Sequence, residues 1–69
     1  MIMLTPRETQ ITERVAMGMA SKNIAHELSI CEGTVKVHLK HAYKKTGQEN
    51  RVKLAVWWRA RSDKSSQSE

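Results

Sequence analysis

The sequence is poor in the features that mark several protein classes. It has one cysteine, Cys31, which cannot form a disulfide within the chain and agrees with a reducing compartment. No apolar run approaches the roughly 20 residues that cross a bilayer. The segment before Thr5-Pro6 also lacks the apolar core of a signal peptide. We therefore expect a cytoplasmic protein with no membrane partner.

Catalytic and metal-binding patterns are also missing. The seven acidic residues are scattered without a matched pair, and no glycine-rich loop could cradle a phosphate. Cys31 lies far from His38 and His41 without a CxxC pair, and His26 would have to come from another helix. We expect neither an enzyme nor a site for a metal, cofactor or small-molecule ligand.

Charge and length are more informative. Twelve Lys and Arg against seven Asp and Glu leave a net charge of +5, with a sequence pI near 9.8. A compact basic domain favours an anionic partner, and nucleic acid is the commonest one. A chain of 69 residues has room for one domain, which buries about 60% of its unfolded surface.

The pattern of caps and apolar residues predicts an all-α fold, a four-helix bundle with helices at about 6–17, 22–28, 32–45 and 51–60. Thr5 and Glu8 form a capping box around Pro6. Ser21 and Asn50 are the expected caps of the second and fourth helices, and Gly47 is placed to end the third. The second and third helices are joined by three residues, which predicts a helix-turn-helix.

Helical spacing also predicts which residues are buried. The expected core residues are Ile11, Val15, Ile24, Ala25, Leu28, Val35, Leu39 and Ala42. Residues 61–69 are polar without apolar anchors, so we expect a disordered tail after a domain over 4–60.

The fourth helix carries more apolar residues than one stripe needs. Leu54, Ala55 and Trp58 share one arc, and Val52 and Val56 lie on another. A symmetric dimer could bury the second arc. Ordinary exposure of a few apolar residues is the alternative.

The third helix has two unlike sides. If 32–45 is helical, one face contains Gly33, Lys36, Val37, Lys40 and Lys44, with three cations and no anion among them. Glycine inside a helix costs up to about 1 kcal/mol relative to alanine and is best tolerated where another backbone comes close. We therefore expect close DNA approach at Gly33. A solvated lysine face is the alternative reading.

Several separated segments carry a resemblance to a known family: LTPRE at 4–8, GMASKNIA at 18–25 and TVKVHLK at 34–40. In order and spacing they resemble the LuxR-type (GerE-like) helix-turn-helix DNA-binding domain, most closely the NarL/FixJ branch of bacterial response regulators. The similarity extends from about Leu4 to Trp58. Cys31 and Gly33 depart from it, since the branch often has Ser or Thr at the first position and a polar side chain at the second.

The resemblance implies a role for each matching residue. Base contacts fall on Lys36, Val37 and Lys40, the face that periodicity also selects. Phosphate contacts fall on or near Lys22, Thr34 and Lys44. The dimer interface of the fourth helix falls on Val52 and Val56, which leaves Leu54, Ala55 and Trp58 for the core.

Two functional hypotheses follow. The first is a sequence-specific transcription regulator, or the output domain of one, that binds double-stranded DNA with helix 32–45 and forms a homodimer through helix 51–60. The second is an interaction module of the same fold that dimerises with or blocks another regulator without reading DNA. The basic face separates them, because a pure blocker has no reason to retain it.

Overall fold

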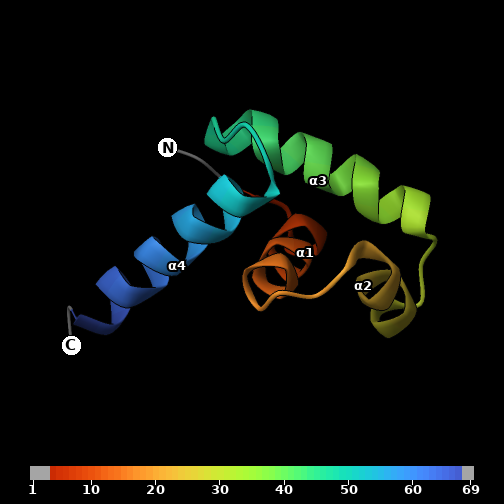
Figure 1. The fold of residues 1–69 in the computed structure, drawn as a ribbon, viewed down its shortest axis with the longest axis horizontal. Coiled ribbons are helices and arrows are strands. Elements are labelled where there is room, and N and C mark those ends of the chain that lie inside the picture. Colours follow the sequence, from red (N-terminus) through yellow and green to blue (C-terminus); the bar gives the residue numbers. More distant parts are fainter. Residues whose placement is uncertain (1–3, 68–69) are drawn as a thin grey trace.

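The computed structural model describes residues 4–67. Within this range the chain forms four helices and no strands: α1 (Pro6–Ala16), α2 (Ser21–Leu28), α3 (Glu32–Thr46) and α4 (Arg51–Gln67) (Figure 1). The predicted all-α fold is confirmed. Apart from the end of α4, each helix begins and ends within one residue of its predicted bounds.

Helix α1 starts with the predicted capping box. Thr5 Oγ1 accepts a hydrogen bond from the Glu8 backbone N–H at 3.2 Å, and Glu8 Oε1 accepts one from the Thr5 N–H at 3.0 Å. Pro6 occupies the first helical position, where a missing N–H costs nothing. Local sequence therefore determines where α1 begins.

The turn between α2 and α3 depends on Ser29, which adopts the left-handed conformation with φ of 58°. The next backbone N–H, that of Ile30, donates to the Ala25 carbonyl at 2.9 Å, and the Ile30 side chain packs against the core. These contacts satisfy the free carbonyls at the end of α2 and turn the chain sharply. The predicted helix-turn-helix is formed in this way.

The predicted cap of α2 is wrong. Ala20 is the N-cap residue and makes no side-chain capping bond, while Ser21 is already helical. Ser21 Oγ instead accepts a hydrogen bond from Arg51 Nη1 at 3.0 Å, and Arg51 Nη2 donates to the Met19 carbonyl. A partner 30 residues away thus takes the hydroxyl that local reasoning assigned to the helix end.

Helix α4 begins as predicted, because Asn50 Oδ1 accepts a hydrogen bond from the Lys53 N–H at 2.9 Å. It ends at Gln67 rather than near Ala60, the predicted end of the fourth helix. The disordered tail over 61–69 stays a prediction, and residues 68–69 lie outside the described part. No glycine or proline follows Ala60. Each added residue therefore gains a backbone hydrogen bond at little cost once the helix is nucleated.

All four helices contribute to one core, with α1 packed against both α3 and α4, and α2 packed against α3. The buried apolar residues are Ile11, Val15, Ile24, Ala25, Val35, Leu39, Ala42 and Leu54. Leu28, predicted as buried, is partly exposed but packs against them.

The two tryptophans of α4 differ in their contact with the core. Trp57 packs against the core together with Ala55, whereas Trp58 is half-buried and lies outside that cluster. The prediction that Trp58 belongs to the core is therefore wrong. Trp57 and Trp58 follow the fully buried Leu54 by three and four residues, and both spacings bring side chains to neighbouring positions on a helix, so helical spacing alone does not separate them.

Candidate nucleic-acid interface

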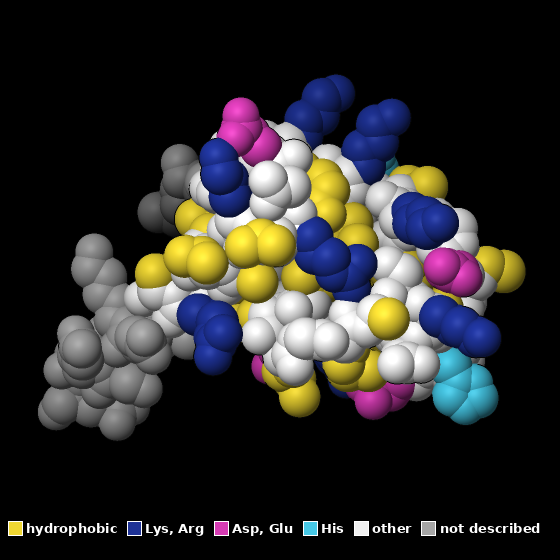
Figure 2. Space-filling view, in the orientation of Figure 1, with side chains coloured by type: hydrophobic (Ala, Val, Ile, Leu, Met, Phe, Trp, Pro, Cys, Tyr) yellow, Lys and Arg dark blue, Asp and Glu magenta, His cyan; other side chains and the backbone are white. Residues whose placement is uncertain are grey.

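The buried stripe of α3 determines which of its side chains reach solvent. Val35, Leu39 and Ala42 are at most 4% exposed. Because a helix repeats about every 3.6 residues, the residues on the opposite side of α3 are exposed to solvent. In Figure 2, Lys and Arg side chains project from the edge of the molecule that α3 forms.

All three residues predicted to contact bases lie on that exposed side. Lys36 and Lys40 are exposed, and Val37 is 51% exposed although it is apolar. An exposed valine between two lysines gives this surface a hydrophobic spot among cations. Both kinds of group match features of base edges in the major groove of DNA.

Gly33 lies on the same side, in the first turn of α3. It has a helical backbone, and a Cβ added there would meet no other atom within 4 Å. Neither packing nor backbone conformation within the chain therefore requires glycine at this position. Its absent side chain leaves open space on the surface where DNA is expected.

The three residues predicted to contact phosphates are also exposed, but they come from different places. Thr34 lies in the first turn of α3 and Lys44 in its last, whereas Lys22 belongs to the first turn of α2. An ammonium group thus stands in the last turn of α3, a hydroxyl in its first turn and a second ammonium group at the start of α2. This spread suits contacts to phosphates that flank a groove.

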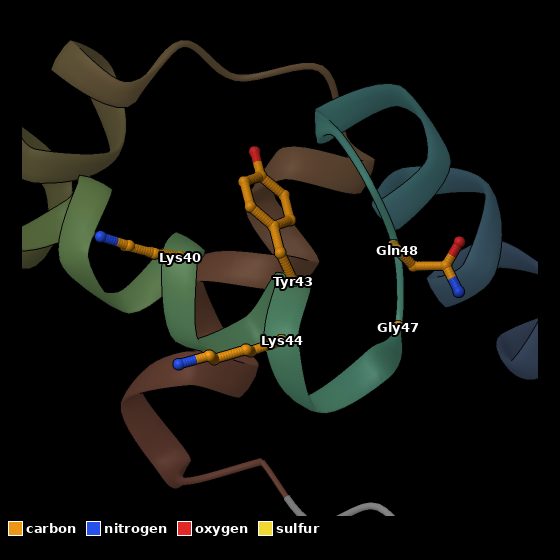
Figure 3. A pocket seen from close by; sticks show the side chains of 5 residues that line it. All are labelled: Lys40, Tyr43, Lys44, Gly47 and Gln48. Carbon is orange, nitrogen blue, oxygen red and sulfur yellow. The ribbon is translucent and has the colours of Figure 1, made fainter.

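An open cleft of about 410 Å³ borders the C-terminal half of this face; it is lined by Lys40, Tyr43, Lys44, Gly47 and Gln48. In Figure 3 the Lys40 and Lys44 side chains extend to the same side of α3, while Tyr43 extends in another direction. Gly47 ends the helix with φ of 72°, as predicted. The two ammonium groups therefore stand side by side, one turn apart.

Glu8 has a second role, besides the capping box, that the sequence did not reveal. Its side chain is 4% exposed, and its carboxylate lies 2.8 Å from Lys45 Nζ and 3.7 Å from His41 Nδ1. Burial raises the pKa of Glu8, but the Lys45 ammonium, the Thr5 N–H and His41 together outweigh burial and hold it below 4.5. Glu8 is thus a buried carboxylate that stays ionised.

This cluster also includes His41. The imidazole of His41 is exposed, and it lies beside the buried Glu8 carboxylate at the junction of α1 and α3. Capping explained Glu8 from the sequence, and Lys45 is 37 residues away. No local signal could have paired them.

The start of α3 contains an anion that the predicted face lacked. Glu32 Oε2 lies 3.8 Å from Lys36 Nζ, one turn further along the helix. Cys31 precedes it as N-cap without a side-chain hydrogen bond. The exposed surface of α3 therefore has four lysines, Lys36, Lys40, Lys44 and Lys45, and one carboxylate, which is paired with the predicted base-contacting residue Lys36.

Val52 and Val56, the predicted dimer residues, are 71% and 61% exposed on α4. They lie one turn apart on a side of the helix that no other described element covers.

Among residues 4–67, no three His, Cys, Asp or Glu side chains gather as a metal site would require. Nor does any described helix combine the length and apolar character needed to cross a bilayer.

Comparison with known proteins agrees with this architecture. Residues 3–58 match the family described as bacterial regulatory proteins, luxR family. Over 54 residues the chain is 52% identical to the nitrate/nitrite response regulator protein NarL of Escherichia coli strain K12, covering 78% of this chain and 25% of that protein. It is 48% identical over 52 residues to the transcriptional regulatory protein UhpA of the same strain, covering 75% and 26%.

A third relative, the CsgBAC operon transcriptional regulatory protein of Escherichia coli strain K12, is 38% identical over 55 residues, which is 80% of this chain and 26% of the relative. The match therefore spans about a quarter of the length of these regulators. The matched region covers all of α1, α2 and α3 and the first half of α4. This chain belongs to the luxR family of bacterial regulatory proteins.

Proposed function

We propose that this chain is a sequence-specific DNA-binding transcription regulator, or the output domain of one, acting in the cytoplasm. The observation that carries the proposal is the division of α3 into a buried side and an exposed basic side. The family and the names of its relatives, which are response regulators and transcriptional regulators, support the same function.

In this proposal α3 lies in the major groove. Lys36 and Lys40 donate hydrogen bonds to guanine O6 and N7, and Val37 contacts a thymine methyl group. The missing side chain at Gly33 lets the start of the helix come close to the DNA. Each residue reaches solvent, so none has to leave the core to meet a base.

Phosphate contacts fix the position of the helix. Two ammonium groups and one hydroxyl stand around the exposed side of α3, contributed by Lys22, Lys44 and Thr34. Contacts of this kind carry no sequence information, but they supply much of the affinity and make it depend on salt.

A homodimer through α4 completes the proposal. Val52 and Val56 place two aliphatic side chains in solvent at i, i+4 spacing, and a twofold contact would bury both copies of that stripe. Two such domains would then occupy inverted half-sites about 34 Å, or one helical turn, apart.

The first test is a gel-shift titration on random duplex DNA at a series of salt concentrations. We expect the logarithm of the affinity to fall linearly with the logarithm of the salt concentration, by about 0.9 per phosphate neutralised. Lys40→Glu should abolish binding. Lys53→Glu is the matched control, because Lys53 lies on α4 and pairs with Glu49.

The same titration also tests the alternative hypothesis, that the chain is an interaction module which does not read DNA. Binding that is absent, or that salt leaves unchanged, would favour an interaction module that acts through α4. Selection of bound sites from a random DNA pool would then test whether the domain reads sequence.

A further inference from the structure

The carboxylate of Glu32, at the start of α3, needs an explanation. Glu32 lies in the first turn of α3 with its side chain 50% exposed, and Lys36 is 68% exposed. DNA repels a carboxylate that faces its phosphates. On a surface that otherwise presents cations, Glu32 therefore lowers affinity for DNA unless it meets a hydrogen-bond donor.

The major groove offers such a donor. The N4 amino group of cytosine projects into it, and a glutamate carboxylate is a suitable acceptor. Lys36, one turn along the same face, is suited to guanine O6 and N7. The paired side chains thus present an acceptor and a donor side by side, which complements a cytosine and a guanine close together in one half-site.

We infer that Glu32 is a specificity-determining residue, accepting a hydrogen bond from a cytosine amino group beside the guanine that Lys36 contacts. This inference rests on the proposed function. In the free protein the carboxylate is paired with the Lys36 ammonium. On a cognate site both groups exchange this pairing for base contacts, whereas on other DNA the carboxylate faces only phosphates and opposes binding.

The same position has a structural explanation, since a carboxylate in the first turn interacts favourably with the helix dipole. The experiment must therefore measure sequence preference as well as folding. Glu49 supplies a matched control: it also pairs with a lysine four residues later, Lys53, and is exposed, but it lies outside α3.

Sites should be selected from a random duplex pool with the wild-type chain, Glu32→Gln, Glu32→Ala and Glu49→Gln. Affinities for the selected site and for random DNA are then measured for each protein, and circular dichroism checks folding. At one position, we expect Glu32→Gln to move preference from cytosine towards adenine, because an amide pairs with adenine N6 and N7. Glu32→Ala should lose preference there, and the ratio of specific to random affinity should fall roughly tenfold.

Three results would count against the inference. It is overturned if Glu32→Ala selects the wild-type motif, if affinity for all duplexes rises by one common factor, or if Glu49→Gln changes the motif equally. Failure of the wild-type chain to select any sequence has a different meaning, since it would overturn the proposed function itself.

Discussion

Lys45 Nζ lies 2.8 Å from Glu8 Oε1, so the last turn of α3 is joined to the first turn of α1. The same carboxylate also closes the capping box with Thr5. One buried side chain thus starts α1 and holds the C-terminal end of α3, and so helps to orient the surface that carries Lys40 and Lys44.

Replacing Glu8 with glutamine should lower the free energy of unfolding. Glutamine retains most of the shape but removes the charge that Lys45 contacts, and a hydrogen bond to a charged group contributes about 1.5–3 kcal/mol. Because Lys45 is 38% exposed, we expect the low end, about 1–2 kcal/mol. Urea denaturation measures it, and Glu13→Gln, an exposed change on the same helix, should stay within about 0.5 kcal/mol of wild type.

The loss should depend on pH. The pKa of Glu8 is held below its ordinary value of 4.5 in the folded chain, so the unfolded chain binds a proton first as pH falls. The stabilisation is therefore fully present above pH 4.5 and is lost as pH falls through the lower folded value. The gap between wild type and Glu8→Gln should narrow at acid pH; a constant gap would show that the Glu8 charge is not its source.

Lys40→Ala and Lys44→Ala should affect binding differently. Loss of a base contact at Lys40 should weaken binding to the selected site by about 1–3 kcal/mol and change preference at one base step. Loss of a phosphate contact at Lys44 should weaken all duplexes alike and reduce the salt slope by about one. If both variants behave the same way on every sequence, the division of the α3 face into reading and holding residues is wrong.

Val56→Glu should separate dimerisation from folding. Val56 is 61% exposed, so a carboxylate there remains solvated in the monomer but would be buried in a dimer contact. We expect an unchanged urea midpoint and a loss of dimer in sedimentation equilibrium. The contrast is Leu54→Ala, which empties a fully buried site and should cost about 2–5 kcal/mol; unfolding of Val56→Glu would mean that Val56 belongs to the core.

Gly33→Ala should make the domain more stable and a poorer DNA binder. The backbone is helical and the added methyl group meets nothing in the chain, so the helix should gain about 0.5–1 kcal/mol. A close approach of DNA would be obstructed by the same methyl group. Thermal unfolding and gel-shift titration measure the two effects, and unchanged affinity would remove Gly33 from the interface.

Much of the fold was predictable because it depends on residues close in sequence. Thr5 and Glu8 form their capping box three positions apart, and Asn50 reaches Lys53 over the same spacing. The apolar residues of α3 recur with the helical period, so Val35 and Leu39 could be assigned to the core and Lys36 and Lys40 to solvent.

The sequence pattern did not reveal relationships that depend on packing. Arg51 donates a hydrogen bond to the Ser21 hydroxyl, 30 positions away in the sequence, and Lys45 donates one to the Glu8 carboxylate, 37 positions away. Trp57 and Trp58 are adjacent and identical, so the packing of α4 against the rest of the domain determines which one contacts the core.

Hydrogen bonds within one turn and the helical period act over three or four residues. These alone led from the amino acids to four helices, the starts of α1, α3 and α4, and a basic face on α3. Only the assembled core decides where those helices cross, which buried carboxylate joins them and which of the two neighbouring tryptophans is covered. The reason is that many side chains could satisfy each long-range contact, and the packing of the whole chain selects one.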